Sequence, residues 1–243
     1  MDCRAGSAPE RQSRTYAMND RILSCKKAEN NGDEYVVEFR SSGPVRFTID
    51  EVMEHGLYDD SLVPDLDALL GAVLETRMKR FILPYCVYAR RTERQIADRL
   101  FERFSVKNGY DGIWAPRIEN AVDNVVSYLI AQGYAGDNVY CVAYIKSCAD
   151  KNVSGNYIAA ELVKRGVERR TANAAVAAAG LDETGACRRA LAKKAGNMTI
   201  GKDENGRVPE KVRAALVRFL LSRGFETGLA VDTVDDYIGE MRD

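Results

Sequence analysis

Three stretches of this chain end in the same way, and this ending limits the folds that the chain can adopt. The pattern Leu-x-x-(Gln/Arg)-Gly-apolar occurs at residues 129–134, 162–167 and 220–225. A glycine just after a helix can take the left-handed conformation that stops it, and the next apolar residue can pack back onto the last turn. The three stretches are unequally spaced along the chain, so the pattern is a shared helix ending and not a strict repeat. It predicts a C-terminal two-thirds made of short helices.

The second of these helices has all the expected parts. Ser154 is a candidate N-cap, because its hydroxyl can accept a hydrogen bond from a free N–H of the first turn. Ile158 and Leu162 lie one turn apart and share an apolar face. Lys164 and Arg165 fall in the last turn, where a positive charge interacts favourably with the helix dipole. We therefore expect an amphipathic helix with one apolar stripe and one basic end.

The chain up to position 76 has a different pattern. Residues 1–20 are polar, without an apolar stretch, and we interpret them as a disordered tail that is not a secretory signal. Alternation of apolar and polar residues then predicts a small antiparallel β-meander. Two helices follow, the first capped by Asp50 and the second opened by Pro64. The expected strands are 21–28, 35–40 and 45–49. We assign residues 21–76 to one small domain of strands plus helices.

From residue 77 the helical pattern predicts nine helices. They group in threes, as three-helix units at 77–136, 137–181 and 182–243. Pro84 interrupts the first helix, so we expect a kink or a late start there. Thr92 and Gln95 have the spacing of a capping box that opens the second. The expected loops at 105–116 and 195–207 are long, and the second contains a candidate hairpin at 204–206.

Several classes of function find little support in this sequence. It contains no phosphate-binding loop, no dinucleotide-binding glycine motif and no zinc-protease or serine-hydrolase motif. His55 is the single histidine, which makes a zinc site or histidine-based catalysis improbable. The six cysteines form no Cys-x-x-Cys pair, so we interpret them as small buried hydrophobic residues. No apolar run approaches the roughly 20 residues of a membrane span. We expect a cytoplasmic protein with no cofactor, no metal and no enzymatic activity.

Charge is distributed unevenly along the chain. Residues 1–75 contain 8 Lys and Arg against 15 Asp and Glu (−7), and residues 76–243 contain 27 against 21 (+6). Basic residues recur at helix ends in all three helical groups, where they can contact phosphates or an acidic protein surface. Tyr128, Tyr134, Tyr140 and Tyr144 could stack on bases, but their spacing favours packing between helices. The candidate binding residues are Arg90, Arg91, Arg94, Lys164, Arg165, Arg169, Arg170, Lys193, Lys194, Arg213, Arg218 and Arg223.

The order of these features resembles the RecX family, the regulators of the RecA recombinase. The resemblance runs from about residue 20 to the end and is carried mainly by 90–104, 118–145, 156–167 and 217–225. The phrase (I)-x-x-E-L-x-x-(K/R)-G-(I/V) is present from Ile158 to Val167, and a later Arg-Gly-Phe phrase is present at 223–225. The strands at the front resemble the extended N-terminal region of some members.

This resemblance implies a mainly α fold, with three tandem three-helix repeats forming an elongated, curved body behind a small antiparallel β-containing domain. It also implies a non-enzymatic, monomeric protein that binds the RecA–DNA filament and inhibits strand exchange and ATP hydrolysis. Such a protein would modulate homologous recombination, DNA repair and the SOS response. Its partners would be a RecA-type filament and single- or double-stranded DNA, with no membrane.

Two other functions remain open at this stage. Three-helix units resemble helix-turn-helix domains, so a DNA-binding transcription regulator is the alternative. However, no dimerisation helix or ligand domain is evident in the sequence. An enzyme that uses the acidic front domain is disfavoured, because no nucleophile, base and oxyanion donor can be assembled.

Overall fold

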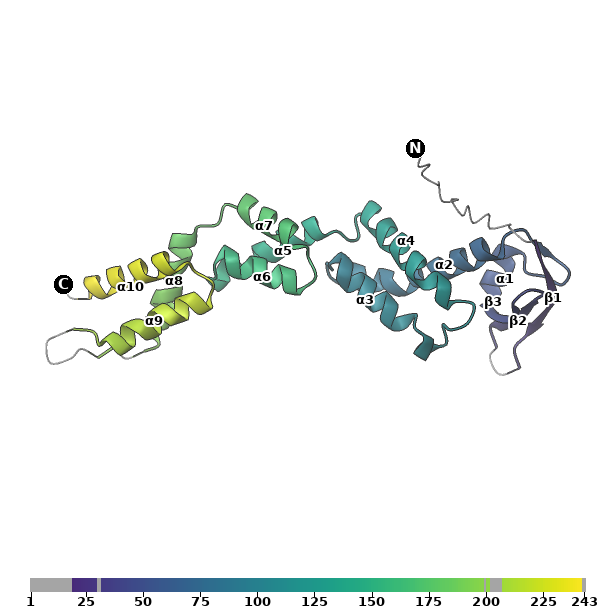
Figure 1. The fold of residues 1–243 in the computed structure, drawn as a ribbon, viewed down its shortest axis with the longest axis horizontal. Coiled ribbons are helices and arrows are strands. Elements are labelled where there is room, and N and C mark those ends of the chain that lie inside the picture. The colour runs from purple at the N-terminus through teal and green to yellow at the C-terminus, as the bar shows by residue number, and fades with distance from the viewer. Residues whose placement is uncertain (1–18, 30–31, 199, 202–206, 242–243) are drawn as a thin grey trace, which may run out of the picture. The chain divides into compact units, whose positions relative to one another are not determined.

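The computed structural model describes residues 19–29, 32–198, 200–201 and 207–241 (Figure 1). This part of the chain is mostly helical, with one four-stranded antiparallel sheet near the N-terminus. The chain divides into two compact units. We call the first the β unit, made of residues up to Arg77 and residues 105–121. We call the second the helical unit, made of residues 78–104 and 122–243. The predicted tail at 1–20 falls almost entirely outside the described residues.

The sheet of the β unit has the strand order β3-β2-β1-β4. The three predicted strands are present, and the two-residue strand β4 was not predicted. Strand β1 pairs with both β2 and β4, and side chains alternate between the core and solvent along β2 and β3. Val37, Phe39 and Phe47 are fully buried in the resulting core. The strands are β1 (Asp20–Lys27), β2 (Glu34–Phe39), β3 (Gly43–Thr48) and β4 (Leu62–Val63).

Helix α1 (Ile49–His55) begins one residue before the predicted cap and is capped differently. Thr48 is the N-cap, and Glu51 completes a capping box by accepting a hydrogen bond from the Thr48 backbone N–H. The prediction that Asp50 caps this helix was therefore wrong. Thr48 lies at the end of β3, so one residue both ends a strand and begins a helix.

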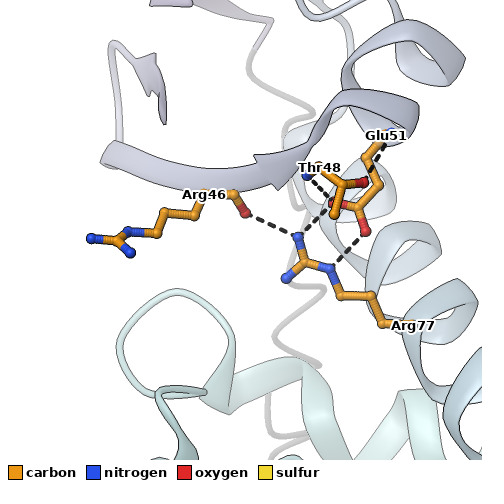
Figure 2. Close-up of polar contacts among 4 residues, drawn as sticks. All are labelled: Arg46, Thr48, Glu51 and Arg77. Carbon is orange, nitrogen blue, oxygen red and sulfur yellow. Dashed lines mark hydrogen bonds and ion pairs between the residues drawn. The ribbon is translucent and has the colours of Figure 1, made fainter. Parts of the chain in front are cut away.

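The buried carboxylate of Glu51 also pairs with Arg77 (Figure 2). Nε and Nη2 of Arg77 lie 2.7 and 2.6 Å from the two Glu51 oxygens. Nη2 also donates a hydrogen bond to the backbone carbonyl of Arg46, at 2.9 Å. The guanidinium group lies 4.9 Å from the ring centroid of Trp114. One arginine thus connects strand β3, helix α1 and the loop before α4.

Helix α2 (Leu66–Tyr88) is one continuous helix of 23 residues, where the sequence predicted two. Its buried apolar residues recur every four positions at 70, 74, 78, 82 and 86, straight through the predicted break. Pro84 lies inside the helix and does not end it. The stripe keeps one face buried over the whole length, and this burial outweighs the hydrogen bond that proline cannot make.

The remaining helices follow the predicted order. Thr92 and Gln95 form the predicted capping box at the start of α3. Gly133, Gly166 and Gly224 all have positive φ, as predicted, and the residue after each donates its N–H to the carbonyl of the leucine that begins the pattern. The helices are α3 (Glu93–Arg103), α4 (Ile118–Ala131), α5 (Asp137–Ser147), α6 (Gly155–Lys164), α7 (Arg169–Ala178), α8 (Glu183–Gly196), α9 (Glu210–Ser222) and α10 (Thr227–Glu240). Short 3-10 helices lie at 106–108, 115–117 and 149–151. The candidate hairpin at 204–206 lies outside the described residues.

Figure 1 shows helices α5–α7 as one group and α8–α10 as another. Each group surrounds its own apolar cluster. Ile158 and Leu162 of α6 are buried in the first cluster, and Leu216 and Leu220 of α9 are buried in the second. We call α2–α4, α5–α7 and α8–α10 the first, second and third helical groups. Of the predicted domain boundaries, 136/137 and 181/182 fall in loops, whereas 76/77 falls inside α2. The division into these domains stays a prediction.

Two joints of the same construction connect these groups within the helical unit. At the first, the Thr92 hydroxyl donates to the Arg165 carbonyl at 2.8 Å, and the Glu93 N–H donates to the Asp137 carboxylate at 3.0 Å. At the second, the Ser154 N–H donates to the Arg223 carbonyl at 3.2 Å. The Gly155 N–H there donates to the Glu183 carboxylate at 2.6 Å.

The shared construction of the joints follows from helix ends. Each places the start of one group's middle helix against the Arg-Gly end of the next group's middle helix. The carboxylate comes from the first residue of the next group's first helix, α5 or α8. Donors and acceptors that helix ends leave unpaired find partners in this way. The joints are therefore polar contacts, and not extensions of the apolar clusters.

Candidate anion-binding site

Six of the predicted cationic residues lie at or beside the two joints, and the other six lie elsewhere on the helices and turns. Arg94, Lys164 and Arg165 lie at the first joint, and Lys193, Lys194 and Arg223 line a pocket beside the second. Arg90 and Arg91 lie in the turn between α2 and α3. Arg169 and Arg170 are the exposed first residues of α7, and Arg213 and Arg218 lie on α9.

The pocket beside the second joint has a volume of about 150 Å³. Its walls come from the 3-10 turn after α5, from the C-terminal half of α8 and from the end of α9. The lining residues are Lys151, Asn152, Ala190, Lys193, Lys194, Asn197, Phe219 and Arg223. Four of these eight side chains are cationic, two are amides and none is a carboxylate. We call this cavity the basic pocket.

The three lysines of the basic pocket, Lys151, Lys193 and Lys194, form no ion pair with any described residue. By contrast, the cavity beside α2 and α4 contains Asp67 and Glu75 next to an arginine. Like charges in one small cavity repel each other, and an anion placed among them lowers their energy. The arrangement is therefore suited to a phosphate or a carboxylate.

Phe219 of α9 lies against two of the pocket's cations, Lys194 of α8 and Arg223 at the end of α9. The Arg223 guanidinium lies 4.9 Å from the centroid of its ring and the Lys194 ammonium lies 5.5 Å from it. One guanidinium nitrogen of Arg223 also donates to the backbone carbonyls of Lys151 and Asn152, at 2.8 and 3.3 Å. Arg223 is consequently preorganised, and it positions the turn that carries Lys151.

The first joint brings three other predicted residues together. The side chain of Arg94 covers Gly166, where a Cβ atom would lie 2.6 Å from it. Arg165 stacks on Tyr144 at 4.8 Å, and Lys164 forms an ion pair with Glu161 at 2.7 Å. Partial burial acts to lower the pKa of Arg165, but Tyr140 and Tyr144 outweigh it and raise the pKa above its ordinary value. Arg165 is positively charged throughout the physiological range.

Other predicted residues have more local surroundings. Arg213 binds Asp235 through two nitrogens, at 2.6 and 2.8 Å, and also contacts Glu210. This pair raises the pKa of Arg213 and lowers that of Asp235. Arg218 is exposed on α9. The two arginines at the start of α7 have no acidic residue in the same turn, although the helix dipole disfavours cations there. They are available to an anionic partner.

Sequence reasoning missed Lys151 and Phe219. Lys151 is far from Arg223 in the sequence, and no local pattern connects the two. Phe219 and Arg223 are one helical turn apart on α9, and that spacing could have indicated an aromatic–cation pair. The prediction that four tyrosines pack between helices holds for Tyr140 and Tyr144 but less well for the other two. Tyr140 is buried and stacks on Tyr144 at 6.1 Å, but Tyr128 and Tyr134 are two-fifths exposed.

Other kinds of site find no support in the described part of the chain. It contains no group of three or more metal-binding side chains, and none of its helices is long and apolar enough to cross a membrane. Cys86, Cys141, Cys148 and Cys187 are buried, as predicted, and Cys25 is partly exposed. Burial raises the pKa of the Cys187 thiol, as expected of an unreactive cysteine.

No family model and no curated protein matches this chain. Solved structures do match. A crystal structure described as regulatory protein RecX superimposes with a TM-score of 0.57 and 15% identity, covering 89% of this chain and 99% of that one. The chain has a RecX-like fold. RecX from Lactobacillus salivarius gives a TM-score of 0.53 and 18% identity, covering 69% of this chain and 98% of its own. The RecX-like fold confirms the predicted fold class of helices behind a small antiparallel sheet.

Proposed function

We propose that this protein is a RecX-like regulator that binds a RecA-type recombinase filament and inhibits strand exchange and ATP hydrolysis. The observation that carries this proposal is the RecX-like fold, which extends over 89% of the chain. The protein acts as a cytoplasmic monomer, without a cofactor and without catalysis of its own. Its effect is exerted by occupying the filament, and it thereby modulates homologous recombination and DNA repair.

The basic pocket supplies a contact for such a filament. A recombinase filament presents DNA phosphates and the carboxylates of its subunits, and both are anions of a size that the pocket admits. Phosphate contacts confer affinity without reading sequence, which suits a regulator that binds anywhere along a filament. Arg94 and Arg165 at the first joint, and Arg169 and Arg170 at the start of α7, are further cations outside the pocket.

The proposal is tested by titrating the protein into RecA-type filaments on single-stranded DNA while ATP hydrolysis is recorded. We expect inhibition with fewer protein molecules than recombinase subunits. The double variant Lys193→Glu with Lys194→Glu should weaken inhibition at least tenfold, because it reverses two charges of the pocket. A matched control is Lys26→Glu with Lys27→Glu, an exposed lysine pair on β1 of the β unit.

Two results would contradict the proposal. One is ATP hydrolysis that the wild-type protein leaves unchanged at any ratio. The other is sequence-selective binding to duplex DNA without any effect on the recombinase, which would favour the transcription regulator. Equal losses in the pocket variant and in the β1 control would remove the pocket from the contact while leaving the regulator proposal intact.

A further inference from the structure

Helix α2 has an aromatic stripe that α3 covers only in part. Phe81, Tyr85 and Tyr88 lie at i, i+4 and i+7, so their rings share one face of the helix. The guanidinium of Arg91 lies 4.2 Å from the Tyr85 ring centroid. That of Arg99 lies 5.7 Å from Phe81 and 6.0 Å from Tyr85. The first two rings of the stripe are thus stacked against arginines of the same molecule.

The third ring is open. Tyr88 is 87% exposed, the largest exposure of any large hydrophobic side chain in the described part of the chain, and its neighbour Val87 is 69% exposed. Both are at the last turn of α2, immediately before the turn to α3. The two side chains are neighbours in the sequence and both are exposed, so they expose apolar surface where a partner can bind.

The residues around this turn carry a net positive charge, which favours an acidic partner. Residues 78–104 contain seven Lys and Arg (79, 80, 90, 91, 94, 99, 103) and three Asp and Glu (93, 98, 102), a net charge of +4. Arg90 is exposed and forms no ion pair among the described residues. The Nε atom of Arg91 is buried and has no hydrogen-bond acceptor there. Arg90 therefore has donors to offer to an acidic partner, and the charge of Arg91 beside it adds to the attraction.

We propose that Val87, Tyr88, Arg90 and Arg91 form an anchor that inserts into an apolar pocket rimmed by carboxylates on a recombinase subunit. This inference rests on the proposed function and adds a protein contact to the anionic contact of the basic pocket. Tyrosine and arginine are the residues that most often dominate binding energy at protein interfaces. The aliphatic Val87 beside the ring favours a protein pocket over a nucleic acid, because a nucleobase gains from stacking on the ring alone.

The test compares Tyr88→Ala with Tyr58→Ala, a control tyrosine that is 54% exposed in the β unit. Binding to RecA-type filaments is measured by co-sedimentation, and binding to single-stranded DNA alone by fluorescence anisotropy. We expect Tyr88→Ala to weaken filament binding at least tenfold and to leave binding to free DNA unchanged. Tyr88→Phe should retain filament binding, because the ring makes the contact. Thermal unfolding of all three variants should match the wild type, since both tyrosines are exposed.

Each outcome has a definite meaning. If the wild-type protein does not sediment with filaments, the proposed function fails and this anchor fails with it. If the wild type binds and Tyr88→Ala binds equally well, only the anchor is overturned. An equal loss of binding to filaments and to free DNA would also overturn it, because the ring would then be stacking on bases.

Discussion

At the scale of single residues, Glu51 and Arg77 pair a buried carboxylate with a mostly buried guanidinium. Burial acts to raise the pKa of Glu51, but hydrogen bonds and charge from Arg77, together with bonds to Thr48, outweigh it and lower the pKa below its ordinary value. The Glu51 side chain is 2% exposed, so removing its charge would leave the mostly buried guanidinium of Arg77 without its carboxylate partner. A sequence pattern could not predict this pair, because its members lie far apart in the chain and on different elements.

We predict that Glu51→Gln destabilises the β unit by about 3 kcal/mol, because breaking one side of a buried ion pair leaves an uncompensated charge. Urea unfolding followed through Trp114 fluorescence measures the loss, since this ring contacts Arg77. The matched control is Arg46→Met, whose side chain is 74% exposed on the neighbouring strand. A loss in the control as large as that in the Glu51 variant would contradict the assignment.

The same pair predicts an acid dependence. A carboxyl whose pKa is lower in the folded protein contributes stability that is complete above its unfolded pKa of 4.5 and is lost as pH falls through the folded value. Below pH 4.5 the wild type should therefore lose stability faster than Glu51→Gln, and the difference between them should shrink. Unfolding curves recorded from neutral pH down into the acid range measure this convergence. Parallel curves over the whole range would show that Glu51 is not the group responsible.

At the scale of elements, the helix endings and the joints explain which parts of the fold were predictable. Caps and glycine stops depend on residues a few positions apart, so Thr92, Ser154 and Gly166 were assigned correctly from the sequence. The same local reasoning split α2 at residue 76, because it did not follow the stripe through Met78. Strand β4 depends on pairing with β1, which lies far from it in the sequence, and so short a strand leaves no periodic signal.

We predict a rank order of cost for alanine at three left-handed glycines. Gly180 has open space around a Cβ atom, so Gly180→Ala should cost about 1 kcal/mol for the backbone conformation alone. At Gly166 the new Cβ would lie 2.6 Å from the Arg94 Cβ atom, which can move only together with the backbone of α3. At Gly224 it would lie 2.9 Å from the Tyr157 backbone nitrogen, which cannot move independently of α6. Gly166→Ala and Gly224→Ala should both be more destabilising in thermal unfolding than Gly180→Ala. If all three substitutions lowered the stability equally, the contacts at the joints would not explain the cost.

At the scale of the whole molecule, the described chain falls into two compact units, and the third helical group of the helical unit has an apolar cluster of its own. Leu220→Ala removes a fully buried side chain from the third helical group and should cost about 2–5 kcal/mol. Hydrogen exchange should then accelerate in α8–α10 and remain unchanged in β1–β3. Leu221→Ala, at an exposed neighbouring position, is the control and should have little effect. Faster exchange throughout both units would mean that they unfold together.

The basic pocket also depends on the arrangement of the helical groups, because its walls come from two of them. The sequence indicated basic helix ends, and three of the pocket's four cations were among the predicted residues. It could not indicate that Lys151 joins them, because that depends on how the second and third helical groups meet at Ser154 and Arg223. Arg213 is the opposite case. The sequence placed it among the residues that bind another molecule, whereas in the structure its guanidinium pairs with Asp235 of the same chain.

Arg213 also has a consequence for how the array of helical groups could be extended. The middle helices α3 and α6 begin at Glu93 and Gly155, ten positions before Arg103 and Arg165 near their ends. In the third middle helix, α9, the position ten before Arg223 is Arg213. The backbone N–H groups of Glu93 and Gly155 donate to a carboxylate of the next helical group. The N–H of Arg213 instead donates to the Pro209 carbonyl, because α9 has an extra turn at its start. A protein engineer who wished to graft another three-helix module here would first have to delete that turn and its arginine.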